Sequence, residues 1–600
     1  MAYKAISIKC TKAIKSYHAR RETNLTRLKS KNFYKFLNNR LKSRSSLPVM
    51  HNDNNGIFTS DSDKANAFIK EFEKVFTTDD GRRPYIDDVG IVCNDESIDF
   101  SVNTVYKHLL NINSSSAAGP DGLPGIFWHS LAGALAEPLS IIFTTSFTRS
   151  SIPLMWKESI ISPIHKKGDP SNVMNYRPVA LTCIPCRVME AIIRDVVMSH
   201  LNENDLLTEY QHGFRKQHST GLQLLQCFND WTAAIDQGYC VDICYIDFAK
   251  AFDTVSIPKL LLKMSAYGIK NQLLSWMTEF LSDRIMRVKV NNRYSNAVTQ
   301  TSGIAQGTCF GPLCFSLFVN DLPLQISNSK CEMFADDVKV YKIFSTPCET
   351  FNLQDDLNSI CEWANTWQLQ ISIPKTFIVH LGYLNPCHDY RLSDNVIVSK
   401  CEVKDLGINI SNDLSWHSQC IEYARKANSV ANAILHCFEC TDINVYMKAF
   451  DTYVRPIVEF NCYVWNPVLK MDIALIENVQ KCFTRRAFYK CGLPRITYSE
   501  RLLFLERESL EKRRMILSMC VFYDIYYGHV HCNILDNFRV PVLSLRGNDC
   551  RLFMPFCKTN IRKIFFSFRI LHVWNSLPNV IVTSNVKTAF KQRIQEYLNV

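Results

Sequence analysis

The sequence predicts an α+β protein that is divided into several domains. Strand-like and helical segments alternate between residues 156 and 412, and the pattern is mostly helical beyond residue 415. A chain of 600 residues is also too long to form a single hydrophobic core. A hydrophobic content of 47% and a charged content of 21% are typical of a globular protein.

Positive charge is concentrated at the start of the chain. The net charge is +11, and residues 1–46 contain thirteen Lys and Arg residues but a single acid, Glu22. We expect a basic helix there, with Phe33, Phe36 and Leu37 on an apolar face. Such an arm favours a polyanion as partner, although a disordered tail or a nuclear localisation signal has the same composition.

The next segment is expected to hold one helix and two irregular stretches. The helix begins after Ser60, which can cap its first turn, and continues to residue 76. Residues 84–99 are acidic and irregular, and residues 114–124 (SSSAAGPDGLP) have the composition of a loop. Neither a signal peptide nor a membrane span is expected, because no long uninterrupted apolar run occurs.

Alternating patterns predict the strands and helices of the central region. Residues 159–164 form a strand that leads into the polar turn KKGDP, and residues 240–248 alternate as a buried strand. A helix begins after Ser256 and ends at Gly268. The remaining expected elements are a strand at residues 287–290, a helix at 313–322 and a hairpin at 331–341.

Three aspartates of this region occupy positions that are typical of the metal site of a nucleotidyl transferase. Asp247 ends a strand in IDFAKAFD, and Asp336 and Asp337 lie at the hairpin tip in FADD. If the strands are neighbours, these carboxylates can hold two Mg²⁺ ions, which prefer hard oxygen ligands. An exposed acidic turn is the alternative for FADD alone. The upstream motif favours the metal site, because clustered carboxylates repel one another without a cation.

Phe252 and the Gln306-Gly307 pair are candidates for nucleotide binding. The Phe252 ring can occupy the place of a ribonucleotide 2′-hydroxyl and so select deoxynucleotides, although an ordinary core phenylalanine is the commoner case. Gln306 can donate a hydrogen bond to a base or sugar, and Gly307 permits close approach of the backbone. By itself the Gln-Gly pair is a weak signal.

Basic residues in three further segments are candidates for phosphate binding. Lys166 and Arg177 flank a polar turn and can grip a triphosphate, while a solvated basic turn is the alternative. Arg215 can bind nucleic acid or triphosphate in the same way. Lys375 can act as a general acid toward pyrophosphate, or it is an ordinary surface lysine.

The region beyond residue 415 contains an amphipathic helix with a basic outer side. Residues 473–490 place Leu475, Ile476, Val479 and Phe483 on one face. Lys481, Arg485 and Arg486 fall largely off that face, and we expect them to contact nucleic acid.

The ordered motifs resemble the reverse transcriptases of non-LTR (LINE-type) retrotransposons, and the jockey-like group in particular. The resemblance covers most of the chain. Its motifs are SSSAAGPDGLP, WKESIISPIHKKGDPSNVMNYRPVALT, EYQHGFRKQHST, IDFAKAFDTV, GIAQGTCFGPLCFSLFVNDL, FADDVKVY, VKDLGINI and YVRPIVEF. Phe334 stands where many polymerases have Tyr, and Arg187 stands where the family more often has Lys.

The resemblance implies a right-hand polymerase fold of fingers, palm and thumb. It divides the chain into a basic N-terminal extension (residues 1–113), fingers and palm (114–412), a helical thumb (413–515) and a C-terminal region (516–600). It also implies RNA-templated DNA synthesis from a DNA primer or nicked target DNA. That reaction uses dNTPs and Mg²⁺, or Mn²⁺ in its place.

By motif match, the family's metal-binding acids are Asp247, Asp336 and Asp337, and its sugar-selecting residue is Phe252. Autonomous members begin with an endonuclease domain, which we expect this chain to lack because the basic linker starts almost at Met1. We expect a nuclear or cytoplasmic ribonucleoprotein. The alternatives are an inactive or domesticated RNA-binding remnant and an RNA-dependent RNA polymerase, the latter disfavoured by the bulk of Phe252.

Overall fold

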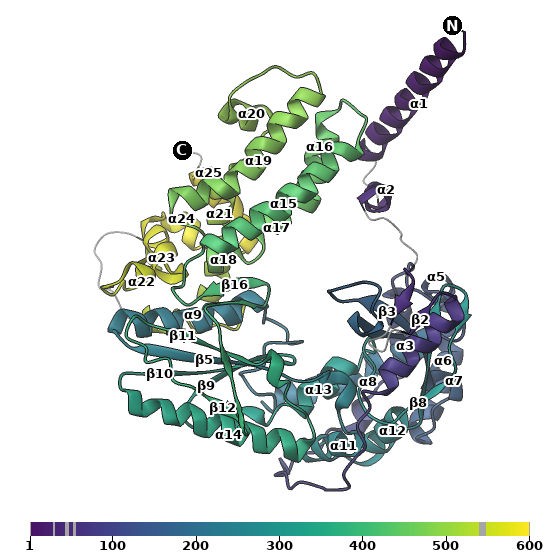
Figure 1. The fold of residues 1–600 in the computed structure, drawn as a ribbon. Coiled ribbons are helices and arrows are strands. Elements are labelled where there is room, and N and C mark those ends of the chain that lie inside the picture. Colours follow the sequence, from purple (N-terminus) through teal and green to yellow (C-terminus); the bar gives the residue numbers. More distant parts are fainter. Residues whose placement is uncertain (1, 28–30, 42–46, 52–55, 539–547, 599–600) are drawn as a thin grey trace.

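The computed structural model describes the chain apart from residues 1, 28–30, 42–46, 52–55, 539–547 and 599–600. Two sheets lie in separate parts of the molecule, and long helices stand above the larger sheet (Figure 1). None of the helices in the described ranges is long and apolar enough to cross a membrane.

The larger sheet, which we call the palm sheet, has the strand order β14-β11-β5-β10-β9. Its strands are β5 (Cys240–Asp247), β9 (Lys330–Phe334), β10 (Asp337–Phe344), β11 (Phe377–Leu381) and β14 (Val398–Ser399). The predicted strand at residues 240–248 and the predicted hairpin at 331–341 are confirmed. Every residue of β5 except Asp247 is buried, because helices cover both faces of the sheet.

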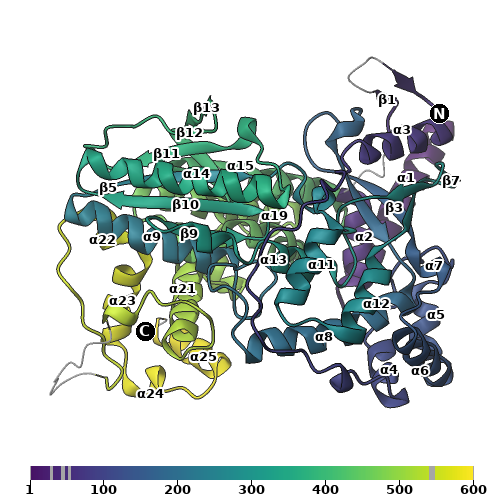
Figure 2. The same cartoon turned by 90° about the horizontal axis from the view of Figure 1, so that it is seen from below.

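Helices α9 (Thr220–Gln237) and α14 (Thr350–Trp367) cover opposite faces of the palm sheet (Figures 1 and 2). Val241 and Ile243 pack in the hydrophobic cluster that contains α9. Cys244 and Ile246, which alternate with them, pack in the cluster that contains α14. The other helices around the palm are α8 (Ile184–Glu203), α10 (Ala251–Thr254), α11 (Ile257–Ala266), α12 (Asn271–Leu281) and α13 (Gly311–Phe318).

The smaller sheet has the order β4-β3-β6-β7, with β8 paired to β6. Its strands are β3 (Glu158–His165), β4 (Tyr176–Leu181), β6 (Arg284–Val290), β7 (Arg293–Tyr294) and β8 (Val298–Gln300). Helix α3 (Asp61–Glu73) packs on this sheet through Phe68 and Phe72. The predicted cap is confirmed, since the Ser60 hydroxyl accepts a hydrogen bond from the Asp63 amide. Around this sheet lie β1 (Met50–His51), β2 (Ile57–Phe58), α4 (Val102–Leu110), α5 (Gly125–Ser130), α6 (Ala132–Thr148) and α7 (Leu154–Lys157).

Helix α13 differs from the predicted helix at residues 313–322. It begins two residues earlier, because the buried Glu190 carboxylate accepts hydrogen bonds from the amides of Cys309 and Phe310 just before it. It ends at Phe318, and the 3₁₀ turn Leu322–Gln325 follows. The capping carboxylate comes from α8, which lies more than one hundred residues earlier in the sequence, so the local pattern could not reveal it.

The region beyond residue 415 is helical, as predicted. Its helices are α15 (His417–Cys437), α16 (Ile443–Ala449), α17 (Arg455–Glu459), α18 (Cys462–Trp465), α19 (Lys470–Lys490), α20 (Tyr498–Phe504), α21 (Leu510–Tyr526), α22 (Asn560–Ile564), α23 (Phe566–Ser576), α24 (Asn579–Val582) and α25 (Lys587–Tyr597). Helix α21 runs through residues 515 and 516, the position of the boundary that the resemblance implies between the thumb and the C-terminal region.

The basic arm and two pairs of short strands lie outside the two larger sheets. The basic arm contains α1 (Ala2–Arg27) and α2 (Lys31–Leu41), and α1 projects away from the body in Figure 1. Short strands β12 (Arg391–Leu392) and β13 (Asn395–Val396) pair with each other, as do β15 (Glu402–Asp405) and β16 (Ile408–Ser411).

Lys263 of α11 is a charged side chain inside the palm core. It is fully buried, forms an ion pair with Asp321, and its Nζ atom lies 3.7 Å from the centre of the Trp367 ring. Burial lowers the pKa of Lys263 to about 8, and the negative charge of Asp321 opposes that change. Lys263 is therefore largely charged at neutral pH.

Replacing Lys263 with Met should lower the free energy of unfolding by about 3–5 kcal/mol near pH 7, because Asp321 would keep a buried charge without its partner. As a control, Lys330→Met breaks an ion pair with Asp230 in which the lysine side chain is 61% exposed. The free energy of unfolding of Lys330→Met should be lower than that of wild type by at most about 1 kcal/mol. Chemical denaturation of both variants measures the difference, and equal losses would contradict this account.

The same lysine predicts a pH dependence of stability. Lys263 titrates at about 8 in the folded protein, whereas an unfolded lysine titrates near about 10.4. Between these values the unfolded chain binds more protons, so folding becomes more favourable as the pH rises. The difference in unfolding free energy between wild type and Lys263→Met should therefore grow from pH 8 to pH 10.

Candidate active site

The three predicted aspartates lie at one corner of the palm sheet. Strands β5 and β10 are antiparallel neighbours, and their register places Asp337 directly opposite Asp247. Residues opposite each other in such a pair direct their side chains to the same face of the sheet. Asp336 lies beside them, in the two-residue tip between Phe334 of β9 and Asp337. The expectation that the strands are neighbours is therefore confirmed.

Burial, together with the like charges at this corner, raises the pKa values of two of the carboxyl groups. Burial, and then the negative charge of Asp247, raise the pKa of Asp336, while Arg177 and Lys166 oppose the change. Asp337 keeps contact with solvent, yet the surrounding protein and the charges of Asp336, Asp405 and Asp247 raise its pKa to about 6. A cation at this corner would relieve the repulsion.

The donor set suits a hard divalent cation, although its side chains are not gathered into a ligand shell. Nowhere in the described ranges do three or more His, Cys, Asp or Glu side chains converge in a way that could hold a metal ion. The Asp247 carboxylate instead pairs with Lys375, whose Nζ atom lies 3.0 Å from Oδ1. Carboxylate oxygens are nevertheless the ligands that Mg²⁺ prefers, usually together with substrate phosphates and water.

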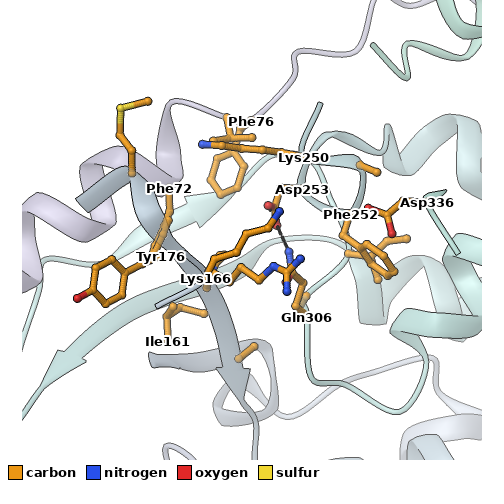
Figure 3. A pocket seen from close by; sticks show the side chains of 18 of the residues that line it. Phe72, Phe76, Ile161, Lys166, Tyr176, Lys250, Phe252, Asp253, Gln306 and Asp336 are labelled. Atoms are coloured by element: carbon orange, nitrogen blue, oxygen red, sulfur yellow. Dashed lines mark hydrogen bonds between the residues drawn. The ribbon is translucent and has the colours of Figure 1, made fainter. Parts of the chain in front are cut away.

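A cavity of about 430 Å³ opens between this corner and the smaller sheet. Its volume falls within the range of about 300–1,000 Å³ that is usual for small-molecule sites. Asp336 and Phe252 lie on one side of it, with Lys166, Asp253 and Gln306 near the middle and Phe72, Phe76 and Tyr176 on the other side (Figure 3). Of the predicted nucleotide-binding residues, those that line the cavity are Lys166, Arg177, Phe252, Gln306 and Lys375.

Phe252 is both packed against other core residues and exposed to the cavity, the two alternatives that the sequence left open. One face of its ring stacks on Phe315 of α13, with ring centres 4.4 Å apart and planes inclined by 20°. The half-buried ring also lines the cavity. Packing against α13 therefore fixes the ring at the cavity wall.

Gln306 is held by Asp253, a residue whose role the sequence analysis missed. The Gln306 Nε2 atom donates hydrogen bonds to the two Asp253 carboxylate oxygens at 3.1 and 3.3 Å (Figure 3). Burial raises the pKa of Asp253 to about 6. The available signal was the second acid of IDFAKAFD, which ends the motif that carries Asp247.

Gly307 is required for close packing between two protein segments. Its φ angle is +115°, and an added Cβ atom would lie 2.7 Å from the carbonyl oxygen of Ala180 in β4. The Ala180 amide in turn donates to the Gln306 carbonyl at 2.7 Å. The close approach at Gly307 is therefore to β4, and it fixes the loop that presents Gln306.

Lys166 and Arg177 line the cavity from the smaller sheet, and Lys375 lies beside Asp247. Arg177 of β4 is paired with Ile164 of β3, and Lys166 follows the end of β3. Burial, and then the positive charges of Arg177 and Lys375, lower the pKa of Lys166. Lys375 is brought close because the Ser372 amide donates to the Asp247 carbonyl at 2.7 Å. This concentration of positive charge favours an anionic ligand.

The other predicted basic residues lie outside this cavity. Arg215 donates to the Thr208 carbonyl at 2.6 Å and lines a second cavity with Phe214 and Lys216. Lys481, Arg485 and Arg486 are exposed on α19, and Arg486 donates a hydrogen bond to Asn432 of α15. They remain candidates for contact with a longer ligand.

The three aspartates lie within a segment that matches a known protein family. Residues 164–410 match the family described as "Reverse transcriptase (RNA-dependent DNA polymerase)". The RNA-directed DNA polymerase from mobile element jockey of Drosophila melanogaster is 28% identical over 329 residues, which cover 53% of this chain and 36% of that protein. The probable RNA-directed DNA polymerase from transposon X-element of the same species is 28% identical over 394 residues, with coverage of 64% and 43%.

A third relative is the probable RNA-directed DNA polymerase from transposon BS of Drosophila melanogaster, which is 27% identical over 305 residues and covers 46% of this chain and 32% of that protein. The matched part thus spans less than half the length of each of these relatives. Residues 164–410 belong to the reverse transcriptase family, and the chain is homologous to the RNA-directed DNA polymerases of non-LTR retrotransposons such as jockey, BS and X-element.

Proposed function

We propose that this chain copies RNA into DNA by transferring nucleotides from dNTPs to the 3′-hydroxyl of a primer. The observation that carries the proposal is the register of β5 and β10, which sets Asp337 opposite Asp247 with Asp336 beside them. The cavity next to these carboxylates also contains the cationic side chains that a triphosphate requires.

Asp247, Asp336 and Asp337 would hold two Mg²⁺ ions, or Mn²⁺ ions, which when bound supply positive charge to the primer hydroxyl and to the pyrophosphate. Lys166 and Arg177 bind and orient the triphosphate. Lys375 lies where it can give a proton to the departing pyrophosphate. All three of these basic side chains line the cavity.

Sugar selection is assigned to Phe252 in this proposal. Its ring lines the cavity while stacked on Phe315, so a 2′-hydroxyl beside it would meet a fixed aromatic surface. Gln306 lines the same cavity. The Gln306 amide is oriented by Asp253, and Gly307 keeps the loop against β4.

The proposed partners are an RNA template and a DNA primer or nicked target DNA. Arg215, Lys481, Arg485 and Arg486 are proposed to contact the nucleic acid outside the nucleotide cavity. The basic arm of residues 1–46 adds a further phosphate-binding segment. We propose that the protein acts in a nuclear or cytoplasmic ribonucleoprotein.

Replacing Asp336 with Asn should abolish most dTTP incorporation on poly(rA)/oligo(dT) with Mg²⁺. Loss of one carboxylate of the set should lower the rate by a factor on the order of a thousand. The control is Asp355→Asn on the exposed face of α14, which should leave the rate unchanged. Equal activity of the Asp336 variant and wild type would refute the metal-binding role. An inactive wild type with intact RNA binding would favour the RNA-binding remnant.

Replacing Phe252 with Ala should raise the incorporation of ribonucleotides relative to deoxynucleotides by about tenfold or more, because the 2′-hydroxyl would no longer meet the ring. Phe351→Ala removes a ring on α14 that is 60% exposed and does not line the nucleotide cavity. That control should leave the ratio unchanged. An unchanged ratio in an active Phe252 variant would assign this residue to the core alone.

Deleting residues 1–17, which contain the exposed basic part of α1, should weaken RNA binding at low salt and flatten the dependence of log affinity on log salt. Each phosphate of single-stranded RNA that the arm no longer neutralises removes about 0.7 from that slope. Turnover at saturating template should be nearly unchanged, since the cavity residues remain. If affinity and slope equal those of wild type, the thumb residues Lys481, Arg485 and Arg486 become the main RNA-binding group, and their replacement by Gln tests this directly.

A further inference from the structure

The hairpin tip that carries Asp336 is held by a buried glutamine from another segment. Gln211 is 2% exposed. Its Oε1 atom accepts a hydrogen bond from the Ala335 amide at 2.8 Å, and its Nε2 atom donates to the Ala335 carbonyl at 3.3 Å. The side-chain amide thus binds both polar groups of the residue that precedes Asp336.

Ala335 is a residue that needs such support. Its φ angle is +57°, a left-handed conformation that is unfavourable for alanine because the Cβ atom crowds the following carbonyl oxygen. Two-residue hairpin tips favour Gly or Asn at such positions. The alanine side chain has no polar group that could stabilise this conformation. The two hydrogen bonds from Gln211 stabilise it instead.

The backbone on both sides of Gln211 is hydrogen-bonded to the hairpin formed by β9 and β10. The His212 amide donates to the Met333 carbonyl at 2.9 Å, and the Met333 amide donates to the Tyr210 carbonyl at 2.8 Å. The Gly213 amide donates to Gln211 Oε1 at 2.8 Å. A Cβ atom at Gly213 would lie 2.5 Å from the Ala335 nitrogen, so this position leaves no room for a side chain.

Gln211 does not line the cavity that contains Asp336, Phe252 and Gln306. It lines the second cavity, beside Phe214 and Arg215. Its hydrogen bonds to the Ala335 peptide connect it to the residue that precedes Asp336. A rotation of that peptide would turn the Cα–Cβ bond of the next residue, and so would move the Asp336 carboxylate relative to Asp247 and Asp337.

We propose that Gln211 is a positioning residue that fixes the Ala335 peptide and thereby the direction of the Asp336 carboxylate. The functional part of this inference rests on the proposed polymerase activity. The structural part, that the Gln211 amide restrains the hairpin tip, does not depend on it. A buried amide that only fills space in the palm is the competing explanation.

Two variants and one matched control separate these explanations. Gln211→Leu keeps most of the volume and removes both hydrogen bonds. Gln211→Glu keeps an acceptor for the Ala335 and Gly213 amides and loses the donor to the Ala335 carbonyl. The control is Gln223→Leu on α9, because Gln223 is fully buried and its amide atoms have no hydrogen-bond partner among the described residues.

Hydrogen exchange of the free protein tests the restraint without any reaction. In Gln211→Leu the amides of the hairpin tip should exchange about tenfold faster, because a hydrogen bond that closes the tip is gone. Gln211→Glu should be intermediate, and Gln223→Leu should match wild type at the tip. Unchanged exchange in Gln211→Leu would overturn the proposal whether or not the protein polymerises DNA.

Primer extension tests the consequence for the carboxylate. Gln211→Leu should lower turnover at saturating dTTP by about 10–100-fold and raise the Mg²⁺ concentration needed for half-maximal rate, while the dissociation constant for primer–template stays within about twofold. Gln211→Glu should recover part of the turnover. Faster tip exchange with wild-type turnover would overturn the positioning role. An inactive wild type would instead count against the proposed function, and the exchange result would still decide the restraint.

Discussion

The pairing register of β5 and β10 is the constraint on which the candidate site depends. Side chains alternate between the faces of a sheet, so a slip of one residue would send Asp247 and Asp337 to opposite faces. The register is fixed far from the carboxylates, by the hydrophobic side chains that β5 directs alternately toward α9 and α14. Two hydrophobic clusters thus hold close together three acids that repel one another.

Basic side chains from several segments lie near the three carboxylates. Lys375 pairs with Asp247 from the segment after α14, and Lys166 and Arg177 approach from the smaller sheet. Behind Asp337, the buried Lys339 of β10 forms an ion pair with Asp405 of β15. Carboxylates and cations around one cavity suit a ligand that brings both metal ions and phosphates, which is the form in which dNTPs are bound.

Much of this arrangement could be predicted from the sequence because it is local. The alternation of residues 240–247 identifies β5, and the FADD motif between two apolar runs identifies the β9–β10 hairpin. The contacts that orient side chains could not be predicted in this way. Asp253 binds Gln306, Glu190 caps the start of α13, and Gln211 holds Ala335. Each joins segments between about fifty and more than one hundred residues apart, where no periodic pattern operates.

The C-terminal helices pack against the palm sheet through α9. The Asp236 carboxylate at the end of α9 accepts hydrogen bonds from the amides of Lys558 and Thr559, and Arg562 donates to the Asn229 carbonyl and the Thr232 hydroxyl at 2.8 Å. Helix α9 therefore lies between these helices and β5, as Figure 1 also shows. One hydrophobic cluster runs from β5 through α9 and α15 to α23 and α25. Because that cluster fixes one face of β5, the segment after residue 557 stabilises the strand that ends in Asp247, although it contributes no side chain to the nucleotide cavity.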